Sequence, residues 1–208
     1  MKKTLIYLLL FPALLGLWGC PGECVGPLYK FQTSLEITPS RDTIRVGDTI
    51  WLKSTFSKHL KDEHSGQMVD FRNAKITFPF QFSELNKTDI MSEKMKDARH
   101  KFYIHAIDGK TTSNEKTAEQ YVEVIDLHDQ YRYQLVVIPK APGVFCIEAA
   151  HAGNGEISQK VKKCGMGEVY QDMIVTDRHL YLFDAFNIPP STSSTDSGLY
   201  AFVVIPKK

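Results

Sequence analysis

The chain has 208 residues, and its 25 lysines and arginines nearly balance its 24 aspartates and glutamates, for a formal charge of +1. This balance, without any basic block, argues against a nucleic-acid-binding protein. The length fits one domain, or one domain with decorations.

The first residues of the chain have the layout of an export signal. Lys2 and Lys3 precede an uncharged stretch that runs from Leu5 to Trp18. A short cationic start, an apolar core and a small residue before a cleavage point together make a secretory signal. The stretch has only fourteen residues and contains Pro12, whereas a spanning helix needs about 20. A permanent membrane-spanning anchor is therefore the weaker interpretation.

The stretch ends in Leu17-Trp18-Gly19-Cys20, which resembles the bacterial lipobox. An aliphatic residue stands three places before the cysteine, and a small residue stands just before it. The resemblance implies that residues 1–19 are a lipoprotein signal peptide, cleaved before Cys20. The Cys20 thiol would then be diacylated and its new amino group acylated, with palmitate as an expected fatty acid. Each buried methylene contributes roughly 0.8 kcal/mol, so more than one acyl chain gives a stable membrane anchor.

The residues behind Cys20 bear on the membrane that the lipid enters. Pro21 stands where Gram-negative lipoproteins of the inner membrane commonly have aspartate, so the outer membrane is expected. Some gut-type bacteria use an acidic cluster just behind the cysteine to export lipoproteins to the cell surface, and here Glu23 is the one acidic residue available. The periplasmic face is therefore favoured, with the cell surface as the alternative. Residues 20–32, with two prolines, two glycines and no periodicity, are predicted to be a tether to a domain at residues 33–208.

The domain is predicted to be β almost throughout. Strands are expected at residues 35–38, 43–56 with a turn at Gly47-Asp48, 75–83, 101–107, 119–127, 131–139, 143–150 and 198–206. Period-two alternation in these runs is typical of a sheet with one buried face. Pro79 is expected to point outward at an edge or a bulge, because proline cannot donate to a ladder. Residues 85–100 break the alternation and are predicted to be a short amphipathic helix or a long loop.

Short strands separated by turn signals, without repeated helices, favour an antiparallel sandwich. The run Val46-Gly47-Asp48-Thr49-Ile50 resembles the second strand of bacterial immunoglobulin-like domains, and residues 142–146 resemble their sixth. The resemblance implies an all-β, immunoglobulin-like antiparallel β-sandwich with one short helical or loop insertion. It departs from the antibody type, because the second strand lacks a cysteine and Val144 stands where a tyrosine would precede Cys146.

The remaining cysteines suggest one disulfide. Cys146 lies nine residues before Gly155 and Cys164 lies nine after it, around a Gly-Asn-Gly turn signal. Folded as a hairpin, the two would face each other at a separation that suits a disulfide, as is common in exported proteins. Free or metal-binding thiols are the alternative. Cys24 is left over and has no assigned role.

The best candidate for a metal site is a polar run of two histidines and two carboxylates: His59, Asp62, Glu63 and His64. It lacks the helical i, i+4 spacing of a zinc protease, and a solvated hairpin loop explains its composition. No metal or other cofactor is therefore expected.

Catalytic motifs are missing from the sequence. It has no Gly-x-Ser-x-Gly elbow and no glycine-rich phosphate loop between a strand and a helix. A polar turn is the favoured interpretation of Asp126, His128 and Asp129, which lie between two predicted strands. No catalytic residue is assigned, and the chain is expected not to be an enzyme.

Aromatic residues are in surplus on the predicted strands: Phe102, Tyr103, Tyr121, Tyr131 and Tyr133. Packing in a two-layer core is favoured, although exposed rings of this kind can stack on sugars or anchor a protein partner. The triplet Asp-Thr-Ile, which contains Thr43 and recurs at Thr49, resembles an O-glycosylation acceptor of Bacteroides-type proteins.

Taken together, these features resemble small cell-envelope lipoproteins of Bacteroides-type bacteria. The resemblance implies a lipid-anchored, non-catalytic module that binds a protein or glycan partner. An accessory subunit of a surface nutrient-uptake or adhesin complex is the alternative, and a hydrolase is a third hypothesis. The sequence leaves the partner's identity and the oligomeric state open.

Overall fold

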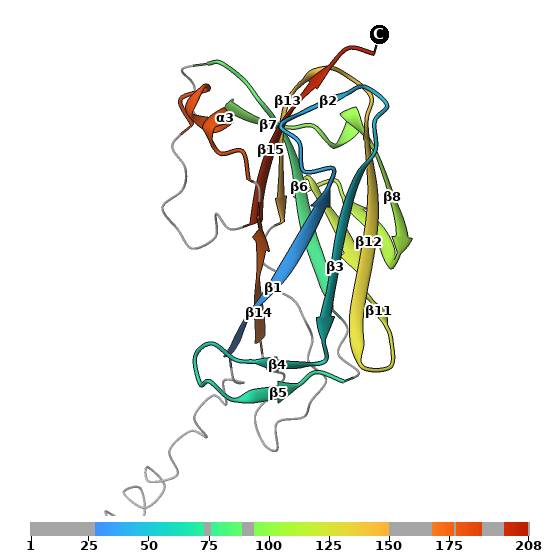
Figure 1. The fold of residues 1–208 in the computed structure, drawn as a ribbon, viewed down its shortest axis with the longest axis vertical. Helices are drawn as coiled ribbons and strands as arrows, with labels where there is room; N and C mark the ends of the chain where they lie inside the picture. The colour runs from blue at the N-terminus through green and yellow to red at the C-terminus, as the bar shows by residue number, and fades with distance from the viewer. Residues whose placement is uncertain are drawn as a thin grey trace, which may run out of the picture.

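A computed structural model describes residues 28–72, 76–88, 94–149, 168–176, 178–188 and 198–207. This part of the chain is almost entirely β and forms two packed sheets (Figure 1). The first sheet contains β1 (Leu28–Thr38), β3 (Ile50–Ser57), β8 (Phe102–Asp108), β11 (Ile125–Asp126), β12 (Gln130–Pro139) and β14 (Glu168–Val175). The second contains β2 (Thr43–Arg45), β6 (Thr77–Leu85), β7 (Met95–Asp97), β9 (Lys110–Asn114), β10 (Glu119–Glu123), β13 (Gly143–Ala149) and β15 (Leu199–Ile205). The predicted all-β class is confirmed.

The core lies between the two sheets and is rich in aromatic rings. Phe102 on the first sheet meets Phe82 at 5.5 Å and Phe145 at 4.9 Å between ring centroids, both on the second sheet. The alternation predicted for β6 is confirmed, since Phe78, Phe80 and Phe82 are fully buried. Each such side chain contributes roughly 1.5–3 kcal/mol when it leaves water. The rings therefore hold the two layers together.

Strand direction departs from the antiparallel prediction at two sheet edges. β14 pairs with β1 in parallel, from Leu28–Glu168 to Leu35–Val175, and β2 pairs with β15 in parallel. Alternation along a strand shows which face is buried, but it carries no information about the direction of the neighbouring strand. Both sheets are therefore mixed.

The expectation for Pro79 is wrong. β6 lies inside the second sheet, between β13 and β10, and Pro79 is buried opposite Tyr121. The described pairing of β6 with β13 ends at Phe80, so Pro79 is the first position beyond that ladder. An interior strand thus accommodates a proline where one of its neighbours ends.

Residues 85–100 contribute short elements where the structure describes them. Strand β7 is followed by a single 3₁₀ turn, η1 (Arg99–Lys101). Residues 89–93 lie outside the described residues, and Lys94, which follows them, is helical. A further α-helix is α3 (Tyr181–Asp184), where Leu182 and Phe183 pack on the outer side of the second sheet. None of the described helices is long and apolar enough to cross a membrane.

The two ends of the sandwich are built differently. A hairpin of β4 (His59–Lys61) and β5 (Met68–Asp70) closes the end at which β1 begins (Figure 1). At the opposite end, Gly47 N donates to Pro139 O at 2.9 Å, and Lys140 N donates to Lys101 O at 2.8 Å. We call this second end the distal end, because it lies farthest from Leu28, where the described chain starts.

Candidate functional site

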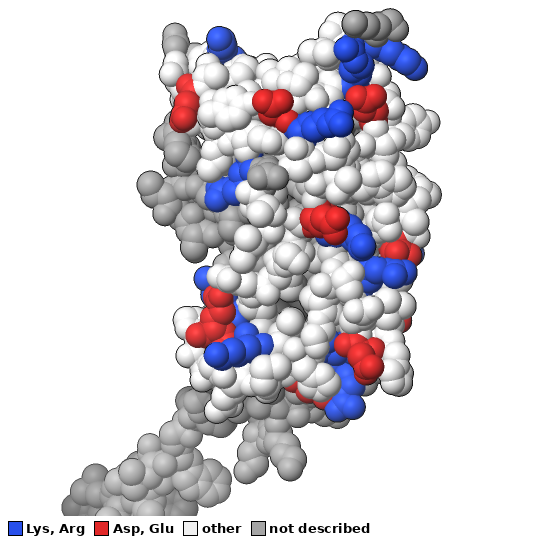
Figure 2. Space-filling model, in the orientation of Figure 1, with Lys and Arg blue, Asp and Glu red and all other residues white. Residues whose placement is uncertain are grey.

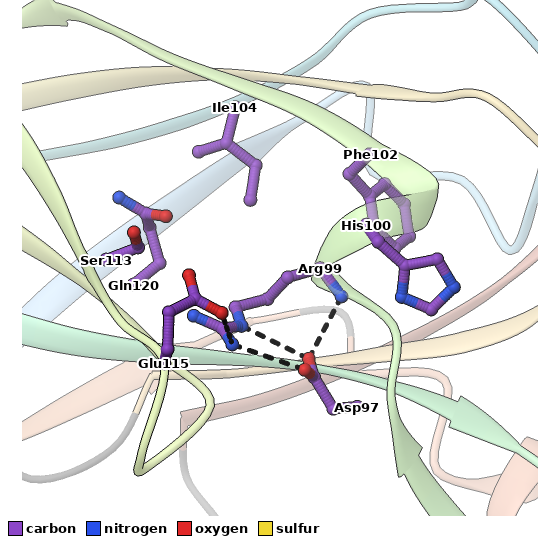
Figure 3. Close-up of a pocket in the computed structure, with 8 residues that line it drawn as sticks. All are labelled: Asp97, Arg99, His100, Phe102, Ile104, Ser113, Glu115 and Gln120. Carbon is purple, nitrogen blue, oxygen red and sulfur yellow. Dashed lines mark hydrogen bonds and ion pairs between the residues drawn. The ribbon is translucent and has the colours of Figure 1, made fainter.

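A cleft of about 480 Å³ opens at the edge of the sandwich, between β8 and the strands β7, β9 and β10 (Figure 3). Phe102 and Ile104 of β8 line it on the first sheet. Its polar lining consists of Asp97, Arg99, His100, Ser113, Glu115 and Gln120. The cleft therefore combines an apolar wall, continuous with the core, and a polar rim.

Arg99 ties the polar rim together. Its Nη1 donates to the backbone oxygens of Asn114 at 3.3 Å and Glu119 at 3.2 Å, on either side of the β9–β10 turn. Its Nε lies 3.2 Å from Asp97 Oδ1, and its Nη2 lies 3.5 Å from Glu115 Oε2. The side chain is only 11% exposed. A planar guanidinium with five donors suits such a clamp, so Arg99 acts chiefly as a structural residue.

The groups of the cleft suit binding better than catalysis. Ser113 is the hydroxyl of its lining and His100 the imidazole, and the two lie on opposite sides of Arg99 in Figure 3. A hydroxyl nucleophile needs its base within hydrogen-bond reach. Hydroxyl, amide and imidazole groups at the rim of a partly apolar cleft are typical of ligand recognition.

A second candidate surface lies on the outer side of the first sheet. Cross-strand partners share a face, and the ladder pairs Tyr103 with Ile138, and Val136 with both His105 and Trp51. We call this surface the β8 face and define it by six residues: Trp51, Tyr103, His105, Ile107, Val136 and Ile138. Tyr103 is 69% exposed and Ile107 is 53% exposed. Large apolar side chains therefore meet solvent on the outer face of the first sheet.

A β-bulge shapes one edge of the β8 face. Ala106 pairs with Leu135 and Asp108 with Gln134, so Ile107 is an extra residue without a cross-strand partner. A bulge re-aims the side chain that it carries, and Ile107 is exposed beside Tyr103 and His105. Sequence reasoning missed Trp51 in this surface, although the alternation of Ile50 and Leu52 already places it on the outer face.

The predicted aromatic surplus divides between core and surface. Tyr131, Tyr133 and Phe102 are buried, as core packing requires. Tyr121 is half-buried and its hydroxyl donates to Glu119, whereas Tyr103 is exposed. Lys140 Nζ lies 5.6 Å from the centroid of the Tyr103 ring.

The polar run at residues 59–64 forms part of the β4–β5 hairpin, and it does not converge on a common point. Asp62 accepts hydrogen bonds from Lys30 N at 2.9 Å and from Ser65 N at 2.8 Å. His59 Nε2 instead lies 3.6 Å from Asp70 Oδ2, across the hairpin. Within the described ranges, no group of three or more metal-ligating side chains occurs. The ladder of β4 with β5 shows that the run lies in a hairpin, in which Asp62 is buried.

Asp126 and its neighbours also have structural roles. His128 and Asp129 are almost fully exposed in the turn between β11 and β12. Asp126 forms an ion pair with Lys58, whose side chain is only 7% exposed and lies 5.3 Å from the Tyr131 ring centroid. The turn interpretation is confirmed, and sequence reasoning missed the buried Lys58.

Cys146 is buried under α3, beside Leu182 and Phe183. Burial raises the pKa of its thiol, which makes the thiol less reactive. Its strand β13 has β15 on one side, opposite Ala201, and β6 on the other, opposite Ser83. The expected hairpin pairing of Cys146 with residue 164 is therefore wrong, because β15 and β6 already occupy both sides of β13 at this position. The local turn signal at residues 153–155 does not reveal these two neighbours.

The other cysteine predictions remain untested. Cys20, Cys24 and Cys164 lie outside the described residues, so lipidation and the Cys146–Cys164 disulfide stay predictions. Of the two threonines in Asp-Thr-Ile triplets, Thr43 is exposed on β2 and Thr49 is half-buried. The predicted tether, residues 20–32, overlaps the start of β1 at Leu28.

No known protein family and no curated protein matches this chain. Among solved structures, it is similar to the human F-spondin reeler domain, with 12% identity over 86% of this chain and 95% of that chain, at a TM-score of 0.38. It is similar to the Reelin-N domain of F-spondin, with 11% identity, coverages of 86% and 92%, and a TM-score of 0.35. The CupB6 tip adhesin from Pseudomonas aeruginosa has 11% identity, coverages of 74% and 44%, and a TM-score of 0.19. At these TM-scores, the likenesses carry no inference about function.

Proposed function

We propose that this chain is a lipid-anchored, non-catalytic module of the bacterial outer membrane that binds a protein or glycan partner through the β8 face. The observation that carries the proposal is the exposure of Tyr103 and Ile107 on the face of the sheet that also carries the half-buried Trp51. Rigid amphipathic rings give much contact area at a low entropic cost, which is why they are enriched in binding surfaces.

The position of the β8 face fits a membrane-anchored binder. Tyr103 follows η1, and its partner Ile138 lies next to Pro139, so both belong to the distal end. The eight residues from Cys20 to Pro27 reach at most about 28 Å when fully extended. A lipid on Cys20 would therefore hold the β4–β5 end near the bilayer and point the β8 face away from it. The periplasmic face of the outer membrane is our preferred location.

We further propose that the sandwich is of the immunoglobulin-like type. The order β1–β3–β12–β8 in one sheet and β15–β13–β6 in the other corresponds to the A-B-E-D and G-F-C orders of that fold. β3 and β13 then occupy the second and sixth places, as the sequence resemblance predicts. The β9–β10 hairpin, which follows β8 and joins β6, and the parallel strand β14 are departures from this plan.

Two experiments test the proposed function. First, Cys20→Ala should move the protein from the membrane fraction to the soluble fraction; persistent membrane association would overturn the lipid anchor. Second, the full mature chain should capture a partner from a detergent extract of its own cells, and Tyr103→Ala should weaken this capture. Tyr181→Ala is the matched control, since Tyr181 is also an exposed tyrosine, at 53%, but lies on α3. Equal capture by all three proteins would contradict binding through the β8 face.

A further inference from the structure

The β8 face offers two aromatic rings on one flat sheet. Trp51 pairs with Val136, and Tyr103 pairs with Ile138, two residues further along β12. Strands lie about 4.8 Å apart and rise about 3.4 Å per residue, so the Cα atoms of the two aromatic residues are about 12 Å apart. The two aromatic residues therefore lie on the same side of the sheet, Trp51 half-buried and Tyr103 exposed, with Val136 and Ile138 on the strand between them.

The surface around these rings has mixed charge. Arg132 Nε lies 2.8 Å from Asp108 Oδ2, and Lys53 is the cross-strand partner of Glu36. Figure 2 shows basic and acidic side chains in small mixed groups over this side of the molecule, with uncharged surface between them. A field of a single sign would favour a charged partner. The mixed field instead favours a partner that carries no net charge.

The size of the β8 face argues against a stable protein interface. Three strands span about 14 Å, and the run from Tyr103 to Ile107 extends a further 14 Å or so along the strand, for a footprint of about 200 Å². A stable protein–protein interface buries about 800 Å² per partner. The β8 face supplies roughly a quarter of that area, which suits a small or chain-like ligand.

Polar side chains flank the rings within the same surface. His105 is exposed two residues from Tyr103 on β8, Gln134 and Lys53 are a cross-strand pair on β12 and β3, and Lys140 Nζ lies 5.6 Å from the centroid of the Tyr103 ring. These groups offer both donors and acceptors. The C–H faces of a sugar ring pack on a flat aromatic ring, while its hydroxyls take hydrogen bonds from such neighbours.

From this arrangement we infer that the β8 face binds a neutral oligosaccharide, with pyranose rings stacked on Trp51 and Tyr103. This inference rests on the proposed binding function and names its ligand class. It assigns recognition to the ring pair and leaves hydrogen bonding to His105 and Gln134.

The test uses the full mature chain in detergent and two panels: neutral hexose and N-acetylhexosamine oligosaccharides, and anionic uronic-acid oligosaccharides for comparison. Trp51 is the single tryptophan after Cys20, so its fluorescence reports on the face directly. We expect a saturable fluorescence change with at least one oligosaccharide. In calorimetry, Tyr103→Ala and Trp51→Ala should each bind about tenfold more weakly, the equivalent of one lost aromatic contact. Tyr181→Ala should bind like the wild type, and matching thermal midpoints confirm that the variants fold.

Three outcomes would overturn the inference. Saccharide binding that is unchanged in Tyr103→Ala and Trp51→Ala would place the site elsewhere. Binding of anionic oligosaccharides alone would refute the neutral class. Failure of the whole panel at millimolar concentration, while Tyr103-dependent capture still yields a protein, would refute the glycan and preserve the proposed function. If no partner, protein or glycan, is captured in a way that depends on Tyr103, the proposed function itself is refuted.

Discussion

Replacing Asp62 with asparagine should loosen the β4–β5 hairpin. Asp62 is only 2% exposed. It accepts hydrogen bonds from Lys30 N at 2.9 Å, Ser65 N at 2.8 Å and Ser65 Oγ at 2.6 Å. Burial alone would raise the pKa of this carboxyl, but these bonds outweigh it and lower the pKa from 3.8 to about 2. At 1.36 kcal/mol per pKa unit, the ionised form contributes about 2 kcal/mol to folding.

The pH dependence of this contribution has a definite sign. The pKa of Asp62 is lower in the folded state than in the unfolded state, so the stabilisation is complete above about pH 4 and disappears as the pH falls toward 2. Urea unfolding of the mature chain should show Asp62→Asn about 2 kcal/mol less stable than the wild type at pH 7, with the difference shrinking between pH 4 and pH 2. The exposed Asp129→Asn is the control and should differ by less than about 0.5 kcal/mol. A stability difference that stays constant down to pH 2, or none at pH 7, would refute the role of the ionised carboxylate.

Three further predictions follow from the fold and the cysteines. Gly109→Ala should lower the free energy of unfolding by about 1–3 kcal/mol, because Gly109 has φ +98° and an added Cβ would lie 2.4 Å from Glu123 O. Gly47 also has a positive φ, +88°, but an added Cβ there would meet open space, so Gly47→Ala should lower the free energy of unfolding by less. Equal decreases in the two variants would argue against the steric contact at Gly109. Arg99→Lys should speed backbone hydrogen exchange in the β9–β10 turn, because an ammonium cannot reproduce the fork of contacts that the guanidinium makes. The exposed control Arg72→Lys should leave exchange in this turn unchanged. Unchanged exchange in Arg99→Lys would refute the role of Arg99 in holding the turn. Reduction should add two hydrogen atoms to the mass of the mature chain by opening the predicted Cys146–Cys164 disulfide, and Cys164→Ser should abolish that gain; an unchanged mass on reduction would refute the disulfide.

Local alternation was a good guide to the buried faces. The pattern of Ile50, Leu52 and Phe56 in β3 and of Phe78, Phe80 and Phe82 in β6 is found in the core. This succeeds because a period of two is a property of the strand itself. By the same rule, Trp51 belongs to the outer face, and only the pairing of Val136 with both Trp51 and His105 shows that it belongs to a larger surface.

Contacts between distant segments were harder to predict. Strand β14 joins β1 in parallel, although the two are separated by most of the chain. Cys146 sits on a central strand, which a local turn signal does not reveal. The guanidinium of Arg99 depends on carbonyl groups of Asn114 and Glu119, which a linear pattern does not bring together. These features follow from sheet order, which no single segment encodes.

The most direct test of the account is photo-crosslinking in living cells. A benzophenone-bearing amino acid is placed at position 103, and in a separate strain at position 181, as an exposed control on α3. Benzophenone inserts into C–H bonds of sugars and of proteins, so it reports either class of partner. Binding through the β8 face predicts an adduct in the outer-membrane fraction from position 103 and none from position 181. Equal adducts at both positions, or none at position 103, would contradict it.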